Sequence, residues 1–151
     1  MSKRRNKEKV DNDIRIKFLG VDDEVTGSCN LVEVDGLKIL FDLGMFQSQT
    51  HRIETIYTIN KEKIERIPFD TIDYVILSSS HADHCGLLGL LGRSDLGFKG
   101  VAICTELAQE LIALNVKDGA YLQLRDCEGY NKKHTDKNLK DTLSLNCIFS
   151  S

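Results

Sequence analysis

Three stretches near the start of the chain carry apolar patterns that predict β-strands. The stretch IRIKFLG (14–20) alternates apolar and polar residues, as in a half-buried strand, with the apolar ones on one side: Ile14, Ile16 and Phe18. NLVEVDG (30–36) and the apolar run of DGLKILFDLG predict two more strands. Asp35–Gly36 separates these two apolar runs, and Asp-Gly in that position is a strong hairpin signal. The chain is therefore predicted to open with an antiparallel meander.

Two further strands are predicted in the second half of the chain. TIDYVIL (71–77) is almost continuously apolar, which is typical of a central strand covered on both faces. GVAICT (100–105) predicts a short strand. Residues 45–69 are less regular, and Pro68 ends whatever structure precedes it.

Helical patterns follow each of these strands. DHCGLLGLLGR (83–93) predicts a short leucine-rich helix with Asp83 at its start. A longer helix is predicted over 105–133, with Thr105 as the N-cap and a break near Asp118–Gly119 after which the helix resumes.

The order of these elements predicts an α/β (mixed α+β) fold: a mixed sheet with helices on one face. Near the end, LSLNCIF predicts one more strand, without a partner. The expected strands lie near 14–19, 30–35, 38–42, 72–77 and 101–104, and the expected helices near 84–92 and 105–130.

The composition indicates one globular domain. The chain has 151 residues, 41% hydrophobic and 28% charged. No apolar stretch approaches the roughly 20 residues that cross a bilayer, so we expect no membrane partner. The five cysteines are widely spaced and form no CxxC pair. We therefore expect reduced thiols and a cytoplasmic location.

Charge is unevenly distributed along the chain. The net charge is −3, yet the first ten residues hold five Lys or Arg and one Glu. Residues 1–13 are predicted to be a disordered basic arm ahead of a domain at 14–151, with contact to a phosphate backbone as the alternative. The acidic remainder argues against a general nucleic-acid coat protein.

SSSHADHCG (78–86) concentrates metal-binding chemistry directly after an apolar strand. Imidazole nitrogen and carboxylate oxygen are common zinc ligands, and a closed tetrahedral site takes about four. His81, Asp83 and His84 are therefore candidate metal ligands. In the alternative interpretation Asp83 caps the following helix and the histidines are ordinary loop residues.

Taken in order, these stretches resemble the metallo-β-lactamase fold, and more narrowly the β-CASP RNA-processing nucleases. Four features carry the resemblance: EVTGSC, ILFDLGMFQ, the HxDHxG run after an apolar strand, and GFKG with a threonine before a helix that reaches DGAYLQLRD. The resemblance extends from about Ile14 to about Lys133. It implies a truncated αββα sandwich, mainly its first half, and a site for two zinc ions.

The resemblance also implies roles for single residues. Aligned to the family motif HxHxDH, Ser79 takes the place of the first histidine, and His81, Asp83 and His84 take the later positions. His81 would then serve one zinc almost alone, and the Asp-His pair would serve the other. Asp42 would buttress the site without binding metal. Asp42 and Asp83 are the candidate catalytic residues that the resemblance implies.

The later ligands of the family have no convincing match in this sequence. His134 comes too early and follows the long helix in a polar tract, and His51 matches no motif position. A serine hydroxyl is a poor zinc ligand at neutral pH, so Ser79 does not replace the missing imidazole.

Three functional hypotheses follow. The first is an incomplete member of the metal-dependent RNA-processing hydrolases, inactive alone. The second is half of a split nuclease completed by another chain. The third is a non-catalytic module that binds RNA or protein. The partners expected under these hypotheses are RNA, a complementing chain, or a second copy held through an exposed sheet face.

Overall fold

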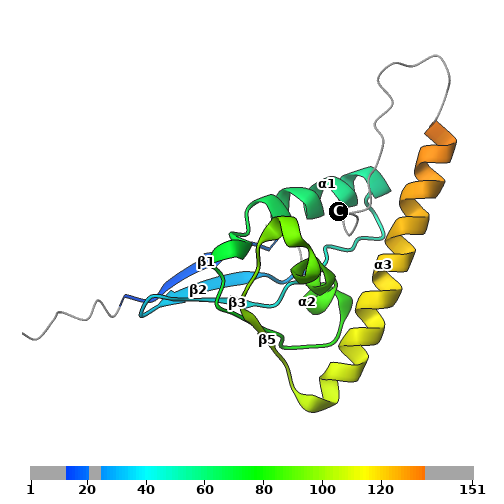
Figure 1. Ribbon diagram of the computed structural model, residues 1–151. Helices are drawn as coiled ribbons and strands as arrows, with labels where there is room; N and C mark the ends of the chain where they lie inside the picture. The colour runs from blue at the N-terminus through cyan, green and yellow to red at the C-terminus, as the bar shows by residue number, and fades with distance from the viewer. Residues whose placement is uncertain (1–12, 21–24, 135–151) are drawn as a thin grey trace, which may run out of the picture.

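The computed structural model describes residues 13–20 and 25–134, and its centre is a five-stranded mixed sheet (Figure 1). The strands lie in the order β1-β2-β3-β4-β5. The first three pair antiparallel, whereas β3, β4 and β5 pair parallel. The strand bounds are β1 Arg15–Phe18, β2 Asn30–Val34, β3 Leu37–Phe41, β4 Tyr74–Ile76 and β5 Val101–Ile103. The predicted mixed sheet and its opening meander are confirmed.

A two-residue turn joins β2 to β3. Val34 pairs with Leu37, so only Asp35 and Gly36 form the loop. Both have positive φ, 49° and 80°, as a type I′ turn requires. Aspartate tolerates this left-handed conformation and glycine adopts it without steric cost. The hairpin predicted from Asp-Gly is therefore confirmed.

Helix α1 (Ile53–Glu65) makes the crossover from β3 to β4 and was not predicted. Its inward-facing positions include Asn60 and Lys63, which are both buried. Two polar residues on the buried face conceal the 3.6-residue period that identifies an amphipathic helix. The helix ends before Pro68, as expected, and a 3₁₀ turn, η1 (Phe69–Thr71), leads into β4.

The single helix predicted over 83–93 is wrong. The chain instead forms a one-turn helix, α2 (Ala82–Cys85), and two 3₁₀ segments, η2 (Leu88–Gly92) and η3 (Ser94–Leu96). Gly86 follows α2 at a close approach, where an added Cβ would lie 2.4 Å from the Ala82 carbonyl oxygen. Asp83 lies in the first turn, and His81 occupies the N-cap position without a capping side-chain bond. The alternative in which Asp83 caps the helix is therefore incorrect.

Helix α3 (Glu106–His134) runs along one side of the molecule and packs against α2 and η2 (Figure 1). Thr105 precedes it, and its hydroxyl oxygen accepts a bond from the Ala108 N–H at 3.3 Å, so the predicted N-cap is confirmed. The predicted break near Asp118–Gly119 is wrong, because the helix is continuous there. A glycine inside a helix costs only about 1 kcal/mol relative to alanine, which is too little to interrupt 29 residues.

The two faces of the sheet are covered very differently. One face carries fully buried residues such as Leu31, Leu40 and Val75, which join one core cluster with residues of α1, η2 and α3. The helices thus lie on one face, as predicted. The register places a second set of apolar residues side by side on the opposite face, and these are exposed: Ile16, Phe18, Phe41, Tyr74, Val101 and Ile103. We call this second set the open sheet face.

The expectation that the first strand is half-buried is wrong for the described part of the chain. Ile14, Ile16 and Phe18 are 64%, 56% and 74% exposed, because no described element packs over them. The predicted basic arm, except Asp13, and the predicted strand LSLNCIF lie outside the described residues. Among the helices of the described ranges, none is both long and apolar enough to span a bilayer.

Candidate functional site

Asp42 is the centre of a hydrogen-bonded cluster at the ends of two neighbouring strands. It follows β3 directly, has a φ of 62° and is 5% exposed. Ser78, just beyond β4, donates its backbone N–H to Oδ1 at 2.8 Å and its hydroxyl to Oδ2 at 2.9 Å. The Ser28 hydroxyl donates to Oδ2 at 2.9 Å. Parallel strands bring their carboxyl ends to the same edge of a sheet, and this explains why residues 36 positions apart meet here.

The cluster keeps Asp42 ionised. Burial by itself raises the pKa of this carboxyl. Hydrogen bonds from the Ser78 backbone and from the side chains of His84, Ser78 and Ser28 outweigh burial, so the pKa lies below its ordinary value. These donors favour the charged form because each of them donates to a carboxylate oxygen.

His84 is oriented by this carboxylate. Its Nδ1 lies 2.8 Å from Asp42 Oδ2 and 3.1 Å from the Ser78 hydroxyl. An ionised carboxylate only accepts hydrogen bonds, so the geometry assigns the imidazole proton to Nδ1. The lone pair of a neutral ring is then on Nε2, which lies 3.6 Å from Asp83 Oδ2. Both side chains are partly accessible, 31% for His84 and 29% for Asp83.

Backbone hydrogen bonds hold the surrounding loops together. Ser28 donates its N–H to the Asp83 carbonyl at 2.8 Å, and Leu43 donates to the His84 carbonyl at 2.8 Å. Gly44 donates to the Ser28 carbonyl at 2.9 Å. A Cβ at Gly44 would lie 1.7 Å from the Asp83 carbonyl oxygen, so only glycine fits there. The position of Asp83 and His84 is thus fixed by their backbone as well as by Asp42.

Asp83 and His84 fit two neighbouring positions around one metal ion. Two ligands of a tetrahedral zinc lie roughly 3.4 Å apart, close to the 3.6 Å between His84 Nε2 and Asp83 Oδ2. In many zinc sites, a histidine binds the metal through one ring nitrogen and donates the N–H of the other to a carboxylate. However, the described residues contain no group of three or more His, Cys, Asp or Glu side chains placed to hold a metal. They therefore do not fit a closed zinc site.

His81 is not brought into this pair. It is exposed, and its backbone N–H donates to the Ser79 hydroxyl at 3.2 Å. His51 lies elsewhere, with Nδ1 2.7 Å from the Ser48 hydroxyl and its ring in a T-shaped arrangement with Phe46. The metal-ligand roles of His81, Asp83 and His84 and the catalytic roles of Asp42 and Asp83 stay predictions.

Sequence reasoning missed the two serines that bind Asp42. Ser28 lies in the EVTGSC stretch and Ser78 opens SSSHADHCG, so both belong to segments that the motifs had identified. Serine is common in loops for purely local reasons, and only the strand order shows that both hydroxyls reach one carboxylate.

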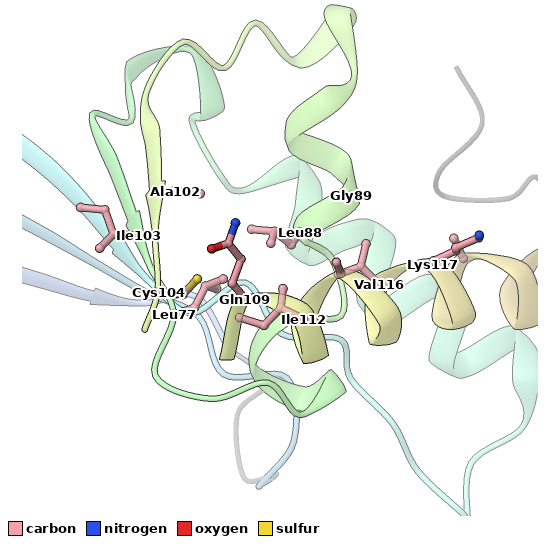
Figure 2. A pocket seen from close by; sticks show the side chains of 12 residues that line it. Leu77, Leu88, Gly89, Ala102, Ile103, Cys104, Gln109, Ile112, Val116 and Lys117 are labelled. Atoms are coloured by element: carbon pink, nitrogen blue, oxygen red, sulfur yellow. The ribbon is translucent and has the colours of Figure 1, made fainter. Parts of the chain in front are cut away.

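A groove of about 720 Å³ opens between the C-terminal ends of β4 and β5, η2 and α3 (Figure 2). Its lining is largely apolar and includes Leu77, Leu88, Ala102, Ile112 and Val116. It contains none of Asp42, Asp83 and His84. The groove is thus separate from the candidate metal residues.

The sequence matches the metallo-beta-lactamase superfamily over residues 22–94. This segment contains β2, β3, β4, Asp42 and the whole of SSSHADHCG. The match confirms the resemblance inferred from the motifs and the partial metallo-β-lactamase fold that it implied.

Full-length relatives extend the similarity beyond that segment. Transcription termination factor FttA of Methanocaldococcus jannaschii is 32% identical over 127 residues, which cover 84% of this chain and 19% of that protein. Ribonuclease TTHA0252 of Thermus thermophilus is 32% identical over 76% of this chain and 26% of its own length. Cleavage and polyadenylation specificity factor 73 of Drosophila melanogaster is 26% identical over 86% of this chain and 18% of its own length. The chain thus spans about a fifth to a quarter of these relatives.

Proposed function

Since this chain carries part of a metallo-beta-lactamase superfamily domain, we propose that it is an incomplete metal-dependent RNA-processing hydrolase that does not cleave RNA alone. The observation that carries this proposal is the chain of contacts from Asp42 through His84 to Asp83. It places one oriented imidazole and one carboxylate at the surface of a fixed loop.

The roles follow from these contacts. Asp42 holds the proton of His84 on Nδ1, and this leaves Nε2 available to a cation beside Asp83. His81 and Asp83 complete the proposed ligand set, although His81 lies outside the pair. Metal-dependent hydrolases use the ion to make hydroxide from bound water near neutral pH. Two adjacent ligand atoms leave about half of a tetrahedral zinc to solvent, so we derive no catalytic step for this chain.

RNA is the proposed substrate class because of the relatives. The names of the three proteins described above refer to transcription termination, ribonuclease activity, and cleavage and polyadenylation. The name of the ribonuclease states RNA as its substrate, and we propose the same substrate class for this chain. We also propose that the metal is zinc and that the protein is located in the cytoplasm.

A second candidate is half of a split nuclease, completed by another polypeptide. Two observations favour it. The described residues supply two adjacent metal-ligand atoms, and the open sheet face exposes apolar side chains that a second layer of structure would cover. A silent RNA- or protein-binding module is the third candidate, and binding that needs no metal would favour it.

The test is hydrolysis of a 5′-labelled single-stranded RNA by the purified chain in the presence of Zn²⁺. We expect no cleavage above that of the His84→Ala variant, because both proteins lack a closed metal site. Zinc-dependent cleavage that disappears in His84→Ala would show that this chain is an enzyme by itself. Cleavage gained on adding a separately expressed polypeptide would instead support the split nuclease.

A further inference from the structure

Helix α1 places a lysine inside the core, in contact with two loops next to the candidate site. Lys63 is 2% exposed, and it is one of three buried polar or charged side chains in the described ranges, with Asp42 and Asn60. Its ammonium donates to the carbonyl oxygens of Gly27, at 3.3 Å, and of Gly44. A buried lysine therefore bridges two separate loops.

Both loops belong to the candidate site. Gly27 precedes Ser28, which donates its hydroxyl to Asp42 and its N–H to the Asp83 carbonyl. Gly44 comes two residues after Asp42 and donates its own N–H to the Ser28 carbonyl. The ammonium thus lies at the junction of the segments that hold Asp42, Asp83 and His84.

Gly27 is adapted to this contact. Its φ is 83°, a conformation that favours glycine, and an added Cβ would lie 3.1 Å from the Lys63 Nζ. The same Cβ would lie 3.1 Å from the Phe46 backbone nitrogen, so a side chain at position 27 would require the ammonium and the Phe46 backbone to shift by a few tenths of an ångström. The loop at Gly27 is therefore closely packed against the lysine.

Burying the Lys63 ammonium removes a charge from water, and this is unfavourable. The need to fill space in the core does not explain why a lysine stands at this position. Burial lowers the pKa of Lys63 to about 8, although the nearby Cys29 acts in the opposite direction. A methionine would fill similar space without desolvating a charge. It would, however, leave the two carbonyl oxygens without this donor and the two loops without their bridge.

We propose that Lys63 is a positioning residue of the candidate site: it clamps Gly27 to Gly44 and so holds Ser28 and Asp42 where they fix the proton of His84 on Nδ1. This inference rests on the proposed function only for the use made of the oriented imidazole. The clamp and its effect on His84 are properties of the metal-free chain.

The test compares Lys63→Met with Lys61→Met, a matched change of an exposed lysine on the same helix. Nitrogen-15 NMR of the His84 ring reports which nitrogen carries the proton, and amide hydrogen exchange reports the loops. In Lys63→Met we expect a mixture of His84 tautomers. The amides of Ser28 and Gly44 should exchange at least tenfold faster relative to those of Leu77 and Val101. Lys61→Met should match the unmodified chain.

Two results would overturn the inference. One is equal acceleration of all four amides with an unchanged His84 spectrum, which would make Lys63 a purely structural residue. The other is no change at all. If Lys63→Met does not fold, Lys63→Gln replaces it. The glutamine amide is one bond too short to reach both carbonyls, so we expect the amides of Ser28 and Gly44 to exchange at least threefold faster. Unchanged exchange of these amides would overturn the clamp. These measurements use no metal and no RNA. They can therefore be interpreted whether or not the chain proves to cleave RNA.

Discussion

At the scale of single residues, the candidate site is built from hydrogen bonds that converge on one carboxylate. Asp42 accepts from Ser28, Ser78 and His84, and its left-handed backbone aims it at them. An aspartate in that conformation costs less than most residues would, because its short polar side chain tolerates positive φ. The modest backbone strain at Asp42 thus accompanies a geometry that orients the His84 imidazole.

Asp42→Asn removes the charge while keeping the size and the tolerance of positive φ. We expect the free energy of unfolding to fall by about 2–4 kcal/mol, because hydrogen bonds to an ionised group contribute about 1.5–3 kcal/mol each and several are weakened together. Urea unfolding measures this loss, with Asp70→Asn, an exposed aspartate, as the control. A loss below about 0.5 kcal/mol, the usual size of surface changes, would contradict the assigned role.

Cys29 gives a pH dependence with a defined sign. Burial raises the pKa of this thiol to about 12, with Lys63 acting against the rise. In the unfolded chain a thiol ionises above pH ~8.5, so between ~8.5 and about 12 the folded state keeps a proton that the unfolded state loses. The stabilising contribution is therefore complete below pH ~8.5 and decreases as the pH rises.

We expect the stability advantage of the unmodified chain over Cys29→Ala to shrink by about 2 kcal/mol between pH 8 and 10. Chemical unfolding at both pH values gives this difference. Lys63, whose lowered pKa acts with the opposite sign, is present in both proteins, so its effect largely cancels. An advantage that stays constant or grows would show that Cys29 ionises readily in the folded state.

At the scale of elements, strands were easier to predict than helices. The Asp35–Gly36 turn carries its own conformational signal, and the alternation of β2 and β3 agrees with it. Helix α1 was missed because Asn60 and Lys63, which bind loop backbone, stand where apolar residues were expected. The helix after β4 is shorter than predicted, and the chain there packs closely on Met45: an added Cβ at Gly86 would lie 2.8 Å from the Met45 Cβ, a tertiary contact that no local pattern contains. The Asp42 cluster needed the strand order, which no local pattern contains.

Helix α3 contains a glycine that can be improved. Gly119 lies in the helix interior, and an added Cβ would meet nothing within 4 Å. Gly119→Ala should raise the free energy of unfolding by about 0.5–1 kcal/mol, because alanine loses less conformational entropy in a helix. Gly100→Ala is the contrasting variant, since its Cβ would lie 2.4 Å from the Asp73 carbonyl oxygen and should destabilise. A neutral or destabilising Gly119→Ala, measured by urea unfolding, would contradict the continuous helix.

At the scale of the whole molecule, the described residues cover one face of the sheet and leave the other exposed. Tyr74 and Val101 on the open sheet face are 36% and 56% exposed, whereas Val75, which points the opposite way, is fully buried. Each 100 Å² of apolar surface left in water forgoes about 2.5 kcal/mol, against a typical total stability of about 5–15 kcal/mol. The isolated chain should therefore associate or bind hydrophobic dyes through this face.

The double variant Phe18→Thr/Val101→Thr should reduce dye fluorescence and self-association, because it removes two exposed apolar side chains. Threonine is β-branched and favours strands, so the sheet should tolerate both changes. Fluorescence and sedimentation velocity measure the two effects. The control is Leu107→Gln, which removes an 86% exposed leucine of α3 that belongs to no strand. Equal effects of both changes would show that association does not depend on the open sheet face.

Zinc titration calorimetry of the chain and of Ser79→His tests the central claim, a metal site of two fixed ligands, most directly. We expect less than one equivalent of weakly bound Zn²⁺ for the unmodified chain. We expect an affinity at least about tenfold higher for Ser79→His, in which a new imidazole acts together with His81. Ser80→His, which adds a histidine next to the motif position, should show no such gain. Two equivalents of tightly bound zinc in the unmodified chain, or equal gains in both variants, would contradict a site of two fixed ligands.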